Sequence, residues 1–200
     1  MNQIFDNINN RRSIRKYKDT AISEKIIKQI IEAGRHAPSS HNSQPWRFIV
    51  ITDRKVIKEL SDMMKRWYKR LLVFEHFVVF NKGLKNLFEV VKKRVSNDKD
   101  LFFYDAPLLI LICAEPKGFA MVDCACAAQN MMLAARSLSI GSCWIGFADR
   151  AFSSKKLRDK AGVPKGLKVM ASIVFGYPFD GFPNSAMPRK DEANVINWIK

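Results

Sequence analysis

Apolar side chains recur at helical spacing near the start of the chain. Ile4, Phe5 and Ile8 fall on one side of a helix, which predicts a short amphipathic helix. Asn9 and Asn10 follow the last of these positions, and the helix is expected to end near them. A polar segment rich in arginine comes directly afterwards.

A second helix is predicted to begin after Ser23, whose hydroxyl suits an N-cap position. Gly34 and Pro38 are expected to close this helix, because glycine and proline are common at and beyond helix C-termini. Its buried side is predicted to consist of isoleucines, namely Ile26, Ile27, Ile30 and Ile31.

Four segments have the pattern of β-strands. Residues 46–52 are rich in β-branched and aromatic side chains. Residues 106–114 form a continuous apolar run, which predicts a strand buried on both faces. Further strands are predicted over residues 141–147 and 169–175.

Three more helices are predicted. The segment 119–138 contains many alanines, which favours a helix that packs closely in the middle of the protein. Residues 152–161 predict a short helix with Ser153 as its cap. A basic amphipathic helix begins at Asp53. Its inward side chains are predicted to be Val56, Leu60, Met63 and Met64.

The composition favours one domain over residues 1–200. Hydrophobic residues make up 48% of the chain, and no Pro/Gly/Ser-rich linker divides it. Residues 61–103 contain more large apolar groups than a free surface carries, and we interpret them as a variable insertion that faces a dimer partner or covers a pocket. These apolar groups are Trp67, Tyr68, Leu71, Leu72, Phe74, Phe77, Val78 and Phe80.

The formal net charge is +15, and residues 54–99 hold thirteen Lys and Arg against five acidic residues. Such a balance favours anionic partners, such as a phosphorylated cofactor or a nicotinamide dinucleotide, and promotes non-specific binding of nucleic acid. A solvated basic surface accounts for most of these lysines. The aromatic groups among them could stack single-stranded bases, but no RNP-like or zinc motif supports a specific nucleic-acid partner.

Neither a metal site nor a membrane segment is expected. Cys124 and Cys126 lie within a predicted helix, which points the two thiols in nearly opposite directions, and paired CxxC spacing is missing. Cys113 and Cys143 also have apolar or small neighbours, which favours reduced thiols. No apolar run approaches the roughly 18 residues that span a bilayer, and no signal peptide is recognised, so we expect a cytoplasmic protein.

Two polar motifs carry the candidate chemistry. The stretch 11–17, Arg-Arg-Ser-Ile-Arg-Lys-Tyr, offers guanidinium groups and a hydroxyl that can grip a phosphate through charge-assisted bonds. The stretch 37–46, Ala-Pro-Ser-Ser-His-Asn-Ser-Gln-Pro-Trp, interrupts a helix and displays short polar side chains. By itself each has an ordinary interpretation, as an exposed basic patch and as a polar connection.

Together and in this order, the two motifs resemble the FMN-dependent nitroreductase family. Residues 141–146, residues 175–178 and the later Pro188-Arg-Lys190 also resemble that family, so the likeness extends over the whole chain. The resemblance implies an α+β fold with a central, mainly antiparallel sheet flanked by helices, in an intertwined homodimer. It also implies FMN bound at the subunit interface.

The resemblance assigns cofactor-binding roles to three segments and a late basic pair. His41 is a candidate pocket-lining residue rather than an assigned catalyst, and a solvated histidine is the more common case for such a loop position. The loop residues are expected to reach the flavin of the partner subunit. The implied FMN-binding residues are Arg11, Arg12, Ser13, Arg15, Pro38, Ser39, Ser40, Asn42, Trp144, Ile145, Gly146, Arg189 and Lys190.

The chain lacks recognisable machinery for nucleophilic or proton-transfer catalysis, such as a Ser/His/Asp order or a paired-carboxylate motif. This fits an enzyme whose cofactor supplies the chemistry. We therefore predict transfer of hydride from NADH or NADPH through FMN to an electron-poor acceptor, such as a nitroaromatic or a quinone. The alternatives are a specialised flavin dehydrogenase, a dehalogenase or flavin-consuming enzyme of the same fold, a non-catalytic flavin-binding or redox-sensing protein, and a basic nucleic-acid-binding module.

Overall fold

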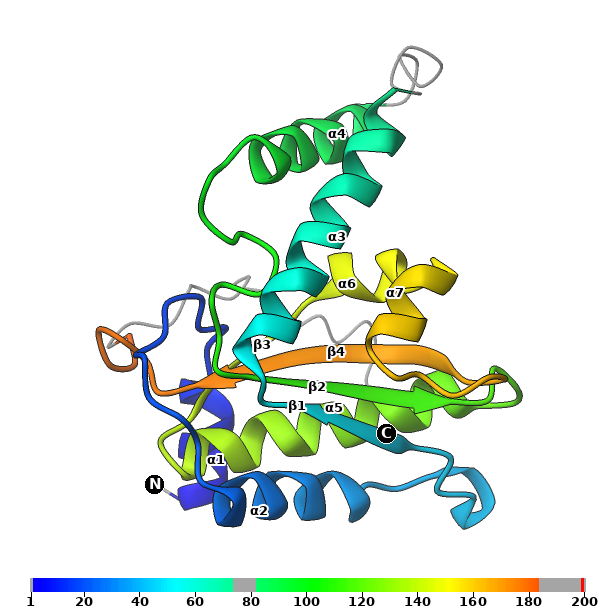
Figure 1. The fold of residues 1–200 in the computed structure, drawn as a ribbon. Helices are drawn as coiled ribbons and strands as arrows, with labels where there is room; N and C mark the ends of the chain where they lie inside the picture. Colours follow the sequence, from blue (N-terminus) through cyan, green and yellow to red (C-terminus); the bar gives the residue numbers. More distant parts are fainter. Residues whose placement is uncertain (1, 74–81, 184–198, 200) are drawn as a thin grey trace.

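A four-stranded antiparallel sheet lies between two layers of helices (Figure 1). The structure, a computed structural model, describes residues 2–73, 82–183 and 199. The sheet has the strand order β1-β2-β4-β3. Its strands are β1 (Arg47–Ile51), β2 (Leu108–Ala114), β3 (Gly141–Trp144) and β4 (Lys168–Gly176). The helices are α1 (Gln3–Asn10), α2 (Glu24–Arg35), the short 3-10 helix η1 (Ser40–Asn42), α3 (Arg54–Leu72), α4 (Lys82–Val95), α5 (Ala120–Ser137), α6 (Gly146–Ala151) and α7 (Lys155–Lys160).

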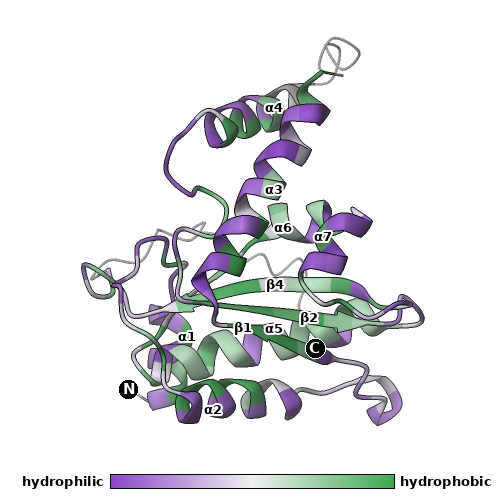
Figure 2. Cartoon of the chain, viewed as in Figure 1, coloured by the Kyte–Doolittle hydropathy of each residue, from purple (hydrophilic) through white to green (hydrophobic). Residues whose placement is uncertain are grey.

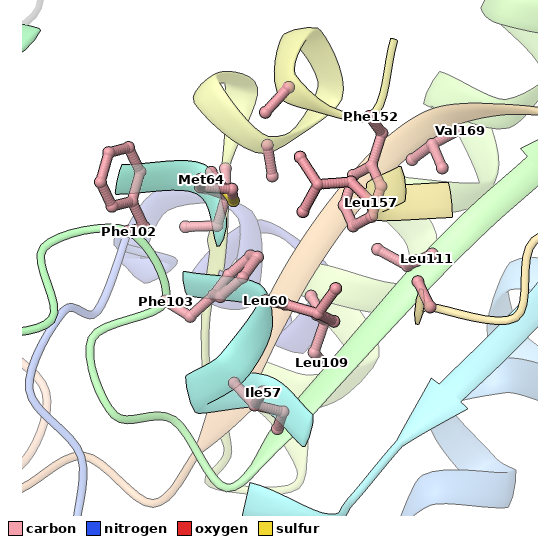
Figure 3. Close-up of a cluster of buried hydrophobic side chains, with 14 of the residues drawn as sticks. Ile57, Leu60, Met64, Phe102, Phe103, Leu109, Leu111, Phe152, Leu157 and Val169 are labelled. Atoms are coloured by element: carbon pink, nitrogen blue, oxygen red, sulfur yellow. The ribbon is translucent and has the colours of Figure 1, made fainter. Parts of the chain in front are cut away.

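Strand β2 is buried along its whole length, as its apolar run predicts. Leu109 and Leu111 belong to the cluster beneath α3, α6 and α7, part of which Figure 3 shows. Ile110 and Ile112 belong to the cluster that α2 and α5 cover. Because side chains alternate along a strand, one apolar run supplies both cores. The hydropathy colouring accordingly shows hydrophobic strands between helices such as α2 and α3, which carry both hydrophobic and hydrophilic residues (Figure 2).

The predicted helix starts are largely confirmed. Ser23 caps α2 through its side chain, and Asp53 caps α3 in the same way. Helix α2 ends at Arg35, between Gly34 and Pro38, as predicted. Gly34 is a buried residue inside α2, where an added Cβ would lie 2.8 Å from the Cγ of Met131. It is therefore a point of close approach between α2 and α5.

The prediction for residues 141–161 needs two corrections. The strand ends at Trp144 rather than at residue 147, and Gly146 begins helix α6. Ile145 still bonds to the sheet, because its N–H donates to the carbonyl of Ser172. The single helix expected over 152–161 is α7 alone, and Ser154, not Ser153, occupies its N-cap position.

Helices α3 and α4 rise away from the sheet (Figure 1). Tyr68 of α3 is buried, with its ring stacked on Phe102 at a centroid distance of 5.5 Å. Val91 and Val95 of α4 are buried in the same cluster. The part of the predicted insertion that the structure describes is thus joined to the main core. The predicted apolar positions Phe74, Phe77, Val78 and Phe80 lie outside the described residues.

Gly176→Ala is expected to destabilise the fold by about 1–3 kcal/mol, the usual cost of overpacking. The added methyl would lie 2.6 Å from the Cδ1 of Tyr17 and 2.8 Å from the Cδ of Pro107. Urea unfolding measures the effect. Gly146→Ala is the matched control, because its added Cβ meets no described atom within 4 Å beyond its chain neighbours and its own helix backbone. Equal stability of the two variants would contradict the close approach at Gly176.

Candidate functional site

The arginine-rich segment 11–17 is fastened to one end of the sheet. The N–H of Ile14 donates to the carbonyl of Ser142 at 3.0 Å, and Tyr17 forms an isolated bridge with Pro178. The contact requires glycine at position 141, because an added Cβ there would lie 2.8 Å from the Cβ of Ile14. The sheet edge therefore fixes the direction in which this segment presents its cations.

The arginines of this segment have different surroundings. Arg12 folds back on the backbone and donates to the carbonyls of Asn9 and Arg11 at 2.6 and 2.7 Å, so it holds the turn. The Nε of Arg12 is buried without a hydrogen-bond partner among the described residues. Arg15 is exposed and lines a cavity. Among the described residues, the segment thus offers an unpaired N–H donor on Arg12 and a positive charge on Arg15 beside the cavity.

This cavity has a volume of about 420 Å³, within the range of small-molecule sites. One wall consists of Arg15 together with the end of β3 and the start of α6, and the other comes from α3, α4 and the segment before β2. The structure therefore brings Arg15 together with Trp144, Ile145 and Gly146, as the site prediction requires. The lining residues are Arg15, Tyr68, Leu87, Arg94, Tyr104, Cys143, Trp144, Ile145, Gly146, Phe147 and Arg150.

A carboxyl group supports the tryptophan of this wall. The indole Nε1 of Trp144 donates to Asp149 Oδ2 at 2.7 Å. Burial raises the pKa of Asp149 to about 6, and the hydrogen bond from Trp144 offsets part of that rise. Asp149 thereby holds the orientation of a cavity-lining side chain. Sequence reasoning missed it, because a carboxylate five residues after a tryptophan is not a recognised motif.

Burial also raises the pKa of the Cys143 thiol, while the positive charge of Arg15 acts in the opposite direction. A protonated thiol is a poor nucleophile. Cys143 therefore contributes shape to the cavity rather than covalent chemistry. Across the described residues, no group of three or more His, Cys, Asp or Glu is arranged to hold a metal ion.

The second motif, residues 37–46, forms a constrained loop. His41, Asn42 and Gln44 have φ values of 50°, 53° and 42°, a region that non-glycine residues adopt infrequently. Asp123 of α5 holds the loop by accepting hydrogen bonds from the backbone N–H of Ser40 at 3.2 Å and the hydroxyl of Ser43 at 3.4 Å. Such strain is typical of functional loops that their surroundings hold in place.

The side chains of this loop face a second cavity of about 600 Å³. Ser40 and His41 line it, together with Phe119 at the start of α5. Ser39 accepts a hydrogen bond from the N–H of Gln44 and is therefore occupied in shaping the loop. Pro38 and Asn42 are exposed. His41 lines this cavity, and its place in a substrate pocket stays a prediction.

The two motifs lie at opposite ends of the sheet within one chain (Figure 1). Ser142, beside the arginine segment, pairs with Phe175, which pairs with Leu108 at the start of β2. Arg47, directly after the loop, pairs with Cys113 at the other end of β2. Five strand steps separate these positions, which amounts to roughly 17 Å. One chain alone therefore does not bring the predicted cofactor residues into one site.

Arg189 and Lys190, the late basic pair, lie outside the described residues. Among the described helices, none combines the length and apolar character that a membrane crossing needs. Sequence reasoning also missed the cavity-lining Arg94, because nothing distinguishes it from the other cations of a basic helix.

Comparisons with known proteins match this architecture. The sequence model of the Nitroreductase family matches residues 8–177, and the chain belongs to this family. A relative from Archaeoglobus fulgidus with the provisional name NADH dehydrogenase/NAD(P)H nitroreductase is 33% identical over 186 residues, covering 90% of this chain and 88% of the relative. The FMN reductase [NAD(P)H] of Bacillus subtilis is 28% identical over 186 residues, covering 90% of this chain and 68% of that protein.

A solved structure agrees with both the fold and the family. The nitroreductase with bound FMN from Bacteroides fragilis superposes with a TM-score of 0.82 at 28% identity, and 100% of each chain is covered. The predicted α+β fold with an antiparallel sheet is therefore confirmed, and so is the family resemblance that the two motifs carry.

Asp149→Asn is expected to change how stability depends on pH. Because burial raises the pKa of Asp149 from 3.8 to about 6, the wild type loses stability as pH rises from about 4 to about 6, where the unfolded chain ionises this group more readily than the folded protein does. The variant keeps an acceptor for Trp144 without the charge. Its unfolding free energy relative to wild type should therefore increase by up to about 3 kcal/mol between pH 4 and pH 8.

Urea unfolding at several pH values measures this difference. Asp98→Asn removes an exposed carboxyl and serves as the control, for which no comparable trend is expected. A stability difference between Asp149→Asn and wild type that stays constant over the pH range would contradict this assignment.

Proposed function

We propose that this chain is an FMN-dependent oxidoreductase that uses NADH or NADPH to reduce an electron-poor acceptor, such as a nitroaromatic or a quinone. The observation that carries the proposal is the cavity between Arg15 and residues 144–146, at the point where the arginine segment meets the sheet. Family membership supports the enzyme class, and the Bacteroides fragilis relative binds FMN. Bound FMN would supply hydride transfer between the nicotinamide nucleotide and the acceptor.

The residues of the cavity fit such a cofactor. A planar ring system needs apolar walls and a close backbone approach, and Trp144, Ile145 and the side-chain-free Gly146 offer both. A phosphate needs cations and hydrogen-bond donors, and the segment beside this wall offers the guanidinium groups of Arg11 and Arg12 and the hydroxyl of Ser13. The buried Nε of Arg12, which has no partner in the part of the chain that the structure describes, is a further donor for an anion.

The chain's own residues have separate tasks in this proposal. Arg15 provides positive charge at the cavity, which stabilises the negative charge that reduction of a flavin creates. Asp149 orients Trp144 through the indole N–H. Tyr68, Leu87 and Arg94 come from the predicted insertion 61–103 and cover the cavity from the other side. We therefore assign that segment a pocket-covering role.

We further propose a homodimer in which each FMN site combines the arginine segment of one subunit with the loop 37–46 of the other. The separation of these motifs by roughly 17 Å along β2 supports this arrangement, because one chain alone leaves the site incomplete. Apolar side chains are exposed near both motifs, at Phe5 on α1 and at Phe119 and Val122 beside the loop. Such exposed groups are typical of subunit interfaces.

An anaerobic spectroscopic titration tests the proposed activity. The purified protein is supplied with FMN, and NADPH and NADH are then added separately. Loss of the oxidised-flavin absorbance near about 450 nm is the expected result, and it identifies the donor. Bound FMN that neither nucleotide reduces would favour a non-catalytic flavin-binding protein, and absence of FMN binding would contradict the proposal.

Mixing two inactive variants tests the shared site. Arg11→Ala removes a charge-assisted phosphate contact worth about 1.5–3 kcal/mol, and Ser40→Tyr fills the loop's cavity while keeping the backbone N–H bond to Asp123. Each variant alone should retain little FMN. A heterodimer of the two regains one intact site, so refolding an equal mixture should restore up to about one quarter of the wild-type FMN content, by the symmetry of a two-fold interface.

Arg35→Ala is the control for the first variant, because it removes an exposed arginine of α2 that pairs only with Glu32 among the described residues. Arg35→Ala alone should keep the full FMN content. Mixing it with Ser40→Tyr should therefore give no FMN beyond the average of the two separate variants. No recovery in the mixture of the two site variants would contradict a site shared between subunits.

A further inference from the structure

The charged side chains that line the first cavity are all cationic. They are Arg15, Arg94 and Arg150, and no aspartate or glutamate stands among the described lining residues. Arg15 belongs to the proposed cofactor site, and Arg150 is exposed on α6. Arg94 is half-buried on α4 and lines the wall of the cavity opposite Arg15 and residues 144–146. The arginine segment already offers cations for the cofactor phosphate, so Arg94 can recognise a second anionic ligand.

Contacts with neutral groups hold Arg94 in place. Its guanidinium lies 4.6 Å from the ring centroid of Phe147 and donates to the hydroxyl of Tyr104 at 3.1 Å. It also donates to the carbonyl of Leu101. Stacking and neutral hydrogen bonds fix the position of a guanidinium without cancelling its charge.

Among the described residues, the hydrogen-bond partners of the Arg94 guanidinium are the Leu101 carbonyl and the Tyr104 hydroxyl rather than a carboxylate, and its Nε is buried without a partner there. A half-buried cation without a counter-charge is costly, and an anionic ligand would compensate it. The surrounding cavity walls are aromatic, with Tyr68, Tyr104 and Phe147 next to the arginine. A planar ring fits these walls, and a carboxylate on the ring is the geometric match for a guanidinium.

We propose that the electron acceptor taken by this cavity is an aromatic carboxylate, and that Arg94 is the residue that selects for its negative charge. The inference rests on the proposed function, since it names the substrate class of the same site. It also gives α4 a specific role, because the insertion then contributes the group that distinguishes anionic from neutral acceptors.

Ligand binding to the FMN-loaded protein gives a test that needs no turnover. Benzoate and its neutral analogue benzamide are titrated by calorimetry against wild type. Benzoate should bind at least about 10-fold more tightly, the effect of one charge-assisted contact. Arg94→Gln should abolish this preference by weakening benzoate binding while leaving benzamide binding unchanged. Lys93→Gln is the matched control, because it removes an exposed cation from the adjacent position of α4 and should keep the preference.

Steady-state reduction gives the corresponding kinetic measurement. The ratio of kcat/KM for 4-nitrobenzoate to that for 4-nitrobenzamide should fall about 10-fold or more in Arg94→Gln and stay at the wild-type value in Lys93→Gln. Arg94→Lys keeps the charge without the planar fork and should retain part of the preference. This second variant keeps the comparison valid if Arg94→Gln does not fold.

The outcomes separate the two levels of the proposal. Protein that binds no FMN, or whose FMN no nicotinamide nucleotide reduces, contradicts the proposed function, and the substrate class fails with it. Reducible, FMN-loaded wild type that binds benzoate and benzamide equally overturns the role of Arg94 alone. A change in NADPH against NADH use in Arg94→Gln, with unaltered benzoate binding, also overturns it and assigns the arginine to the nucleotide phosphate.

Discussion

The burial of β2 on both faces is the constraint on which the rest of the structure depends. Seven consecutive residues from Leu108 to Ala114 are removed from water, and their alternation supplies one core beneath α3, α6 and α7 and another above α2 and α5. β1 and β4 pair with the two edges of this strand. Both polar motifs then attach to the ends of the sheet that it organises.

The two polar motifs can form ligand sites because the ends of the sheet hold them in fixed positions. Gly141 and Gly176 lack side chains, so residues 11–17 lie against the strand ends, and Arg15 reaches the cavity. Asp123 holds the strained loop at the other end. Neither polar motif belongs to a regular helix or strand beyond the single turn of η1. The sheet thus positions backbone segments whose own local preferences would not hold them there.

The cationic character of the cavity comes from three separate parts of the chain. Arg15 precedes α2, Arg94 belongs to α4 and Arg150 belongs to α6. Only Arg15 falls within a motif that the sequence makes recognisable. The other two converge through packing of the helical layer on the sheet, so the overall charge of +15 indicated anionic ligands without indicating where they bind.

Local patterns determined the elements whose signals are local. The Ser23 cap, the start of α3 at Asp53, the buried run of β2 and the alanine-rich α5 are all present as predicted, because capping and hydrophobic periodicity act over a few residues. Prediction failed where tertiary contacts override the pattern. The apolar residues after Trp144 resemble a strand, yet the chain turns into α6 at Gly146.

The sequence by itself determined the family, the α+β class and the residues of the two motifs, since those depend on residue type and order. Only the tertiary structure decided that Gly34 is a packing contact, that Asp149 supports Trp144, and that Arg94 faces the cavity of Arg15. It also decided that the two motifs stand at opposite ends of one sheet. The physical reason is that these relations join residues distant in sequence or depend on side-chain direction, which local propensity does not encode.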